Sequence, residues 1–218
     1  MSAMYFSQTL LVFWLFQNGF GFSELIVYYL LSFLIALVGI FIFPKKQMSS
    51  KKAIFWGMIF SALSVLVLVR IFSPMQIYIS AIFSGLNVIF FWIPYNIMYF
   101  KYGSDSKIGA NSGAYYLITP IIGITLQPLT GIVAEKFGFE FMFLLGIIMY
   151  IVPLILLYFL PDFKWELNIK KELLVSKFNW STLLQGMSSK INFTIIPIFT
   201  LFFITTPRQF GNFFGYLA

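Results

Sequence analysis

Seven polar side chains that lie within long apolar stretches are the residues of this chain that could do chemistry. They are Asn87, Asn96, Tyr115, Tyr116, Gln127, Lys190 and Asn192. An amide or ammonium group is costly in hydrocarbon, so such a side chain faces either another helix or a water-filled cavity. These residues are therefore candidates for lining a cavity that binds a polar solute. The alternative for any single Asn or Gln is a hydrogen bond between helices that serves packing alone.

Lys190 is the candidate with the largest cost of burial. If its helix begins near Trp180, the Lys190 Cα lies about 15 Å along the helix axis. A charge at that depth costs roughly 2.5–3.5 kcal/mol, so it needs a cavity or a partner and could bind an anionic solute. The alternative is that the membrane-embedded part begins at Lys190, whose ammonium then reaches the cytoplasmic surface.

The residue types that most enzymes use are missing from this chain. It contains no His and no Cys, and its seven Asp and Glu residues fall in connections or at the ends of apolar segments. It therefore has no paired carboxylates in a span, no Ser-His-Asp set, no metal-ligand cluster and no phosphate-binding loop. We expect no catalytic residues, no metal and no cofactor.

Composition identifies the solvent of this chain as lipid. Of the 218 residues, 60% are hydrophobic and 10% are charged. Soluble domains are nearer 45–50% apolar and about 25% charged. There is too little polar surface to cover a globule in water. The sequence therefore predicts an integral membrane protein of the all-α class, with the lipid bilayer as its partner.

Seven apolar segments are long enough, or nearly so, to cross a membrane as helices. They cover residues 4–20, 24–43, 53–72, 76–99, 109–134, 140–160 and 181–206, and an eighth begins near Phe210. The first segment is short and contains amides, so it spans only marginally and could be tilted. Pro94 is expected to kink the fourth segment. The sequence thus predicts a polytopic helical bundle of about seven spans.

The placement of the basic residues predicts the orientation of the chain. The net charge is +7, and the connections after the second, fourth and sixth segments hold ten Lys and Arg residues against three in the other connections. Basic connections stay in the cytoplasm. We therefore expect a multi-pass protein of the cell or cytoplasmic membrane with a cytoplasmic N-terminus, and no nucleic-acid partner.

Glycine and proline punctuate the fifth segment. Gly123, Gln127, Pro128 and Gly131 stand in the order G-x-x-x-Q-P-x-x-G. Glycine lets a neighbouring backbone approach closely, and proline removes a backbone donor and can bend the helix. These residues suit either a helix that packs statically or a helix that moves between two units.

The pattern resembles the N-terminal half of the major facilitator superfamily of secondary transporters, followed by the start of its C-terminal half. The fifth-helix motif of that family, G-x-x-x-G-P-x-x-G-G, is similar to the stretch that contains Gly123, Pro128 and Gly131. Residues 134–143 are similar to the turn of that family into its sixth helix. On the fourth segment, Gly85 and Pro94 stand where members of that family often have a glycine and a proline.

The chain departs from that family at several positions. Gln127 and Ile132 replace glycines of the fifth-helix motif. The connection at residues 44–52 lacks the Asp and the central Gly of the family signature G-x-x-x-D-R-x-G-R-R. Ala81 lies near the position where many proton-coupled members have an arginine. Gating and proton coupling by the usual residues are therefore not implied.

The resemblance implies a division into three parts. Residues 1–160 would form a six-helix transmembrane bundle, residues 161–180 a cytoplasmic amphipathic linker, and residues 181–218 helix seven and the beginning of helix eight. A twelve-helix transporter would need more spans, so we expect an incomplete chain whose C-terminal half is missing. The implied function is secondary active transport of a small solute by alternating access. A membrane scaffold or assembly protein, and a channel or flippase-like protein, stay open as alternatives.

Overall fold

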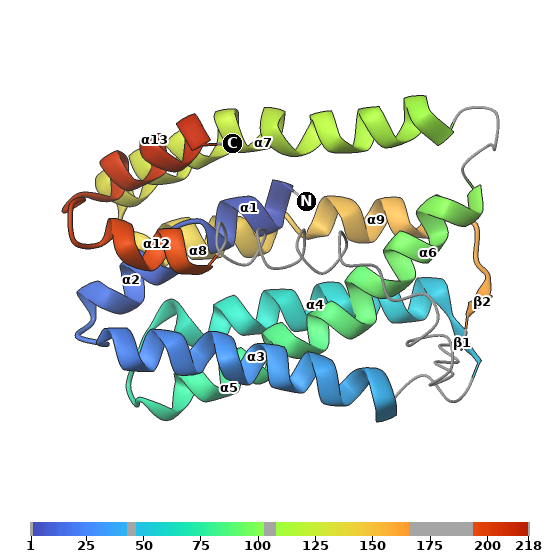
Figure 1. The fold of residues 1–218 in the computed structure, drawn as a ribbon, viewed down its shortest axis with the longest axis horizontal. Helices are drawn as coiled ribbons and strands as arrows, with labels where there is room; N and C mark the ends of the chain where they lie inside the picture. Colours follow the sequence, from blue (N-terminus) through green and yellow to red (C-terminus); the bar gives the residue numbers. More distant parts are fainter. Residues whose placement is uncertain (1, 43–46, 103–107, 166–193, 218) are drawn as a thin grey trace.

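The computed structural model describes residues 2–42, 47–102, 108–165 and 194–217 (Figure 1). Most of these residues are helical, so the predicted all-α class is confirmed. The helices are α1 (Ser2–Gln8), α2 (Leu11–Gln17), α3 (Phe22–Ile42), α4 (Ser50–Val69), α5 (Met75–Asn87), α6 (Ile93–Tyr102), α7 (Ile108–Phe137), α8 (Phe139–Ile148), α9 (Ile151–Phe159), α12 (Ile196–Thr200) and α13 (Pro207–Leu217). A π-helical turn, Val88–Trp92, joins α5 to α6, and two short strands, β1 (Met48–Ser49) and β2 (Lys164–Trp165), pair antiparallel.

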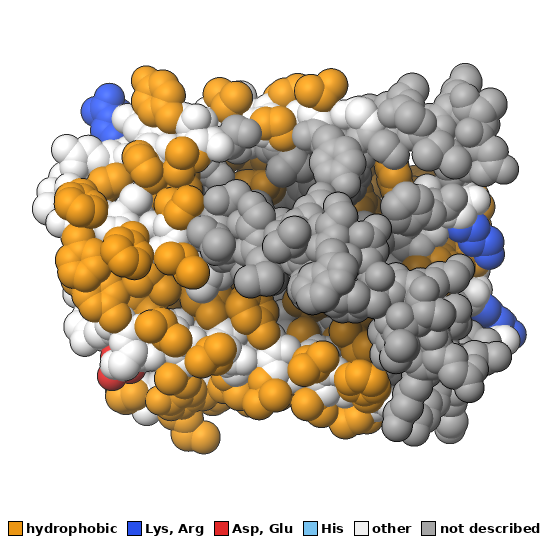
Figure 2. All heavy atoms as spheres, viewed as in Figure 1, with side chains coloured by type: hydrophobic (Ala, Val, Ile, Leu, Met, Phe, Trp, Pro, Cys, Tyr) orange, Lys and Arg blue, Asp and Glu red, His pale blue; other side chains and the backbone are white. Residues whose placement is uncertain are grey.

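Four helical segments in the described part of the chain are long and apolar enough to cross a membrane. They are Phe22–Ile42, Ser50–Val69, Met75–Tyr99 and Phe139–Phe159. Large apolar side chains lie exposed along these helices, for example Leu30, Leu34 and Leu37 on α3. Figure 2 shows such side chains spread over the visible face. In water this exposure would be costly, so the fold fits a membrane protein.

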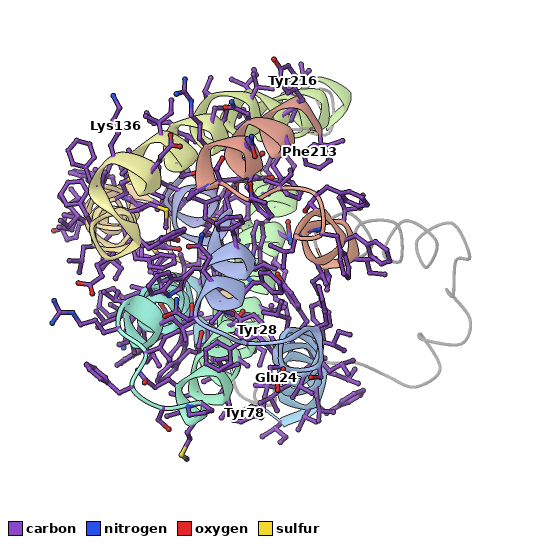
Figure 3. The ribbon with its side chains drawn as sticks, turned by 90° about the vertical axis from the view of Figure 1, so that its left-hand side faces the viewer. Glu24, Tyr28, Tyr78, Lys136, Phe213 and Tyr216 are labelled. Atoms are coloured by element: carbon purple, nitrogen blue, oxygen red, sulfur yellow. The ribbon has the colours of Figure 1, made fainter. Side chains whose placement is uncertain are left out.

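The long helices run side by side, and the ends of the described helices gather at two ends of the molecule (Figure 1). The start of α4, the end of α6 and the strand pair meet at one end, which we call the lysine end because it carries Lys51, Lys52, Lys101 and Lys164. The turns from α4 to α5 and from α7 to α8 lie at the other end, which Figure 3 views directly and where the Lys136 side chain extends outward. The second of these turns is made at Gly138, whose φ of 85° favours glycine.

Two of the apolar segments are broken where the local sequence disturbs the hydrogen-bond ladder. The first segment divides into α1 and α2 at Thr9, whose hydroxyl donates to the Tyr5 carbonyl one turn back. Such bonds compete with the ladder and bend helices. The sixth segment divides at Met149 and Tyr150, because Pro153 has no N–H to donate to the Met149 carbonyl.

The fourth segment passes its proline by a different device. The π-helical turn precedes Pro94 by one residue, and the Ile93 N–H donates to the Val88 carbonyl five residues back. A π turn widens the helix by one residue. We infer that this extra residue makes room for the proline ring, which would otherwise clash with the Phe90 carbonyl. The predicted disturbance at Pro94 therefore takes the form of a widened turn.

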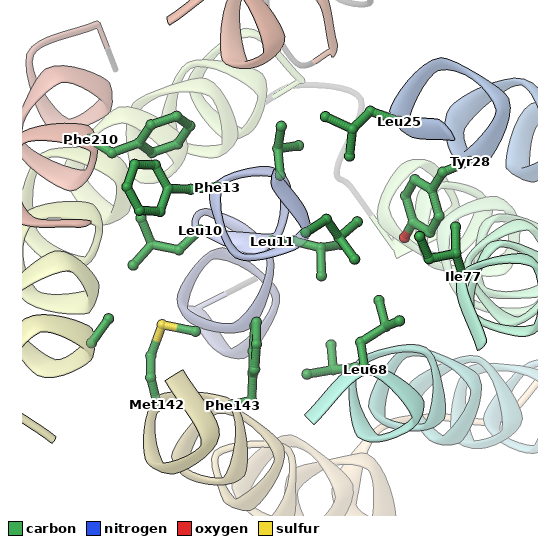
Figure 4. Close-up of a cluster of buried hydrophobic side chains, with 14 of the residues drawn as sticks. Leu10, Leu11, Phe13, Leu25, Tyr28, Leu68, Ile77, Met142, Phe143 and Phe210 are labelled. Carbon is green, nitrogen blue, oxygen red and sulfur yellow. The ribbon is translucent and has the colours of Figure 1, made fainter. Parts of the chain in front are cut away.

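The main core surrounds α2, toward the end of the molecule opposite the lysine end (Figure 4). Leu10 and Phe13 lie on the side of Met142 and Phe210, whereas Leu11 faces Leu25, Leu68 and Ile77 from other helices; all are buried. Burying a side chain of this size contributes about 1.5–3 kcal/mol relative to exposure in water. Among lipid-exposed helices the same contacts act mainly through close packing. The first segment therefore lies at the centre of the main core.

Polar side chains tie α4 to the α8–α9 pair as well. At the end opposite the lysine end, Arg70 Nε donates to Glu140 Oε2 at 3.0 Å. Halfway along, the hydroxyl oxygens of Ser61 and Tyr150 lie 2.6 Å apart. A third tie, at the lysine end, involves Asp162 and is described below. The third and sixth segments are thus held together at three levels.

Candidate functional site

One face of α7 is buried along the length of the predicted motif. Gly123, Gln127, Thr130, Gly131 and Ala134 are all buried, and their spacing places them on one side of the helix. Exposed isoleucines and leucines occupy the other side. At Gly131 this face is in close contact with α13.

The helix α13 lies antiparallel against this face, with very little space between the two backbones (Figures 1 and 3). A Cβ atom added to Gly131 would lie 2.7 Å from the Pro207 carbonyl oxygen. A Cβ atom added to Gly211 would be closer still to the Gln127 carbonyl oxygen. Farther along, a Cβ atom on Gly215 would lie 2.7 Å from Cγ of Pro128. We call this contact between α7 and α13 the glycine seam.

A hollow of about 270 Å³ opens at the edge of the glycine seam. Its walls are Ile124, Pro128, Asn212, Gly215 and Tyr216. Two of these residues carry polar side chains and the others are apolar or lack a side chain. This volume is just below the range of pockets that hold small molecules, which is about 300–1,000 Å³. Ile124 is 57% and Tyr216 is 92% exposed, so the hollow is an open groove on the outer surface and not an enclosed site.

Gln127 lies buried within the seam, with 8% of its surface exposed. Its Oε1 accepts no hydrogen bond within the described part of the chain. A buried oxygen without a donor costs about 1–3 kcal/mol, so it needs an explanation in a native protein. A water or a solute with a donor group would satisfy this oxygen. Among the candidates from the sequence, Gln127 is therefore the one whose side chain could accept a hydrogen bond from a solute.

Asn87 follows the packing interpretation instead. It is buried on α5, and its Nδ2 donates to the Gly57 carbonyl on α4 at 2.8 Å. Gly57 has no side chain, and this lets the Phe91 backbone approach closely. A Cβ atom added to Gly57 would lie 2.5 Å from the Phe91 backbone nitrogen. Asn87 and Gln127 thus belong to two different helix–helix interfaces, and their side chains do not share a site.

The remaining candidates are described only in part. Asn96 is half-buried on α6, one turn nearer the lysine end than the π turn. Tyr115 and Tyr116 lie on α7, but their side chains are outside the described part of the structure. Lys190 and Asn192 fall outside the described residues altogether. Their roles as cavity-lining residues stay predictions.

Asp162 is an interaction centre that the sequence analysis missed. Its carboxylate accepts hydrogen bonds from the hydroxyls of Ser49, at 2.9 Å, and Ser50, at 3.1 Å. It also accepts from the Lys51 N–H at 3.2 Å, and Ser49 Oγ in turn accepts from the Lys52 N–H. The carboxylate therefore sits at the N-terminus of α4, where unpaired N–H groups favour a negative charge. The only sequence signal for it was a serine pair before an apolar segment.

Burial and hydrogen bonding act on Asp162 in opposite directions. Burial by itself raises the pKa of this carboxyl, but the hydrogen bonds from Lys51, Ser49, Ser50 and the Phe163 N–H together hold the pKa below its ordinary value. The group is therefore ionised at neutral pH. The connection at residues 44–52 lacks an Asp of its own, and the structure brings one to the start of α4 from beyond α9.

No family model, no curated protein and no solved structure matches the chain. Function is therefore inferred from the geometry of these residues.

Proposed function

We propose that this chain is a secondary active transporter of the major facilitator type that moves a small solute across the membrane by alternating access. The observation that carries the proposal is the glycine seam. It joins α7, in the first bundle of the proposed architecture, to α13, which follows the central connection. Two bundles can rock against each other only where their side chains do not interlock. The glycine seam is such a contact, because backbone meets backbone there.

The proposed span count is seven, with an eighth helix beginning at α13. In this proposal α1 and α2 together form the first span, and α7 forms the fifth. The alternation of connections between two ends supports this count, because each long helix begins at the end where its predecessor stopped (Figure 1). The basic connections would then face the cytoplasm, as the distribution of Lys and Arg predicts.

The proposed solute site lies beside the glycine seam, near Gln127. Within the described part of the chain its Oε1 has no hydrogen-bond donor, which favours a solute that carries one. The hollow lined by Asn212 lies at the edge of the same seam, although Gln127 is not one of its walls. With no carboxylate on the buried face of α7, the site has no side chain there that would bind a cation strongly. The proposal is therefore a small polar solute, uncharged or anionic.

Cysteine labelling tests the proposal, because the chain contains no native cysteine. A membrane-impermeant maleimide should label Gln127→Cys in sealed vesicles, since alternating access opens the seam to water. Two controls should stay unlabelled: Leu129→Cys on the exposed apolar face of α7, and Phe143→Cys in the core. If Gln127→Cys is as unreactive as Phe143→Cys from both sides of the vesicle, alternating access at this seam is refuted.

A membrane scaffold is the second candidate function, and the Asn87 hydrogen bond favours it. A scaffold uses its polar side chains as links between helices, which is how Asn87 contacts Gly57. In a scaffold, Gln127→Cys and Asn87→Cys would both resist labelling. Proteoliposomes loaded with a panel of small polar solutes would separate the two functions further, since only a transporter would exchange one of them.

A further inference from the structure

Among the described residues, the lysine end carries four lysines and one carboxylate, that of Asp162. Within the described residues, Lys51, Lys52, Lys101 and Lys164 lie there, and none has a carboxylate oxygen within 4.0 Å. The one ion pair of the described residues joins Arg70 to Glu140 at the other end of the molecule. Asp162 is close by, but the cap of α4 already occupies its oxygens. Within the described part of the chain, these ammonium groups are therefore left without a carboxylate partner and could attract an anion from outside it.

These lysines are brought together by contacts that fix their positions. Lys164 pairs with Ser49 in the strand ladder. Ser49 precedes Lys52 by three residues, so Lys164 lies near the start of α4. Lys101 Nζ lies 4.5 Å from the ring centroid of Phe163, the residue next to Lys164. Phe163 is buried, so the segment that carries Lys164 is anchored to the bundle. The backbone positions of Lys52 and Lys164 are therefore fixed by the helix start and the strand pair, which lowers the entropy cost of binding a ligand.

An exposed apolar shelf adjoins the cluster. Tyr158 and Phe159, at the end of α9, are 80% and 76% exposed. Lys51 Nζ donates to the Tyr158 carbonyl at 2.8 Å and lies 5.9 Å from the Tyr158 ring centroid. Aromatic side chains beside lysines at a helix end are typical of the boundary between headgroups and acyl chains. Ammonium groups above an apolar shelf match the two halves of an acidic phospholipid.

We propose that the lysine end is a binding site for an acidic phospholipid, with the headgroup phosphate at Lys52 and Lys164 and an acyl chain along Tyr158 and Phe159. This site is separate from the glycine seam and does not depend on transport. Each lysine near an anionic headgroup strengthens binding by roughly fivefold. Lys52 and Lys164 are exposed and are the members of the cluster best placed to contact a phosphate, since Lys51 and Lys101 already contact Tyr158 and Phe163.

Native mass spectrometry of the purified chain tests this site. The protein would be exchanged into mixed micelles that contain phosphatidylglycerol and phosphatidylcholine with the same acyl chains. We expect the wild type to retain phosphatidylglycerol preferentially, and the double variant Lys52→Gln/Lys164→Gln to retain it at least tenfold more weakly. The matched control, Lys136→Gln/Arg208→Gln, removes the same charge at the other end and should leave retention unchanged.

Three results would overturn the proposal. One is equal retention of the two lipids by the wild type, and another is an equal loss in the two double variants. The third is displacement of phosphatidylglycerol by millimolar inorganic phosphate, which would assign the cluster to free phosphate instead. The charge-preserving variant Lys52→Arg/Lys164→Arg should retain the lipid, and it shows that any loss in the Gln variant arises from charge and not from misfolding.

Discussion

At the scale of single residues, contacts between distant parts of the chain were the hardest to predict. Asp162 and Ser49 are 113 residues apart, and no local pattern connects them. The serine pair before α4 does indicate a helix start, but serine caps usually act alone. By contrast, the need for small residues at Gly131 was readable from the sequence. The sequence did not identify the opposing helix. The structure shows that it is α13, whose Gly211 and Gly215 face α7.

Asp162→Asn should destabilise the protein in a pH-dependent way. Because folding lowers the pKa of Asp162 below its ordinary value of 3.8, its stabilisation is present at neutral pH and is lost as the pH falls below that value. At pH 7 we expect a loss of about 1 kcal/mol, the usual worth of a helix cap. Thermal unfolding of detergent-solubilised protein at several pH values measures this.

The control for that measurement is Glu135→Gln, which removes an exposed carboxylate of α7. It should shift the unfolding temperature little at any pH. A difference between wild type and Asp162→Asn that stays constant from pH 7 down to pH 3 would contradict the role assigned to the ionised carboxylate.

Gly211→Ala should destabilise the glycine seam. The added methyl group has no room beside the Gln127 carbonyl, so the helices must separate at a cost of about 1–3 kcal/mol. Gly113→Ala is the matched control, because a Cβ atom there meets nothing within 4 Å. Alanine favours a helix over glycine by about 1 kcal/mol, so the control should unfold at the same or a higher temperature. Equal destabilisation by the two variants would rule out close approach at Gly211.

At the scale of elements, the sequence predicted one of the three disturbed places described above, the one at Pro94. The proline in the fourth segment was expected to produce a kink, and the chain accommodates it with a π turn before Pro94. The break between α1 and α2 has no proline and could not be placed in advance. The Thr9 hydroxyl donates to a backbone carbonyl at this break, but Thr125 makes the same bond inside the unbroken α7, so the residue type alone does not predict a break.

The hydrogen bond between Ser61 and Tyr150 should couple α4 to the α8–α9 pair. A double-mutant cycle with Ser61→Ala and Tyr150→Phe measures the coupling free energy. We expect about 0.6 kcal/mol, with an upper limit near 1.7 kcal/mol, as for other hydrogen bonds between membrane helices. Additive effects of the two substitutions would mean that the 2.6 Å contact contributes nothing beyond packing.

At the scale of the whole molecule, charge counting anticipated the arrangement of the connections. Lys52 and Lys101 come from connections that the sequence assigns to the cytoplasm, and the structure places them at one end. Lys136 lies at the other end (Figure 3). The packing of α13 against α7 could not be anticipated, because the apolar pattern of residues 207–217 does not specify a partner.

The orientation of the chain in the membrane gives a further prediction. In intact cells, an impermeant maleimide should label Lys136→Cys from outside and should leave Lys101→Cys unlabelled until the cells are opened. The two positions are exposed at opposite ends, so each serves as the control for the other. The reverse pattern would invert the proposed topology.

The three polar ties between α4 and the α8–α9 pair have a mechanical consequence. A helix held at one point can still turn about its own axis, whereas a helix held at its start, middle and end cannot turn without breaking a tie. The three ties therefore restrain α4 against turning about its own axis relative to the α8–α9 pair. We therefore expect α4, α8 and α9 to keep their relative rotation when other helices of the molecule move.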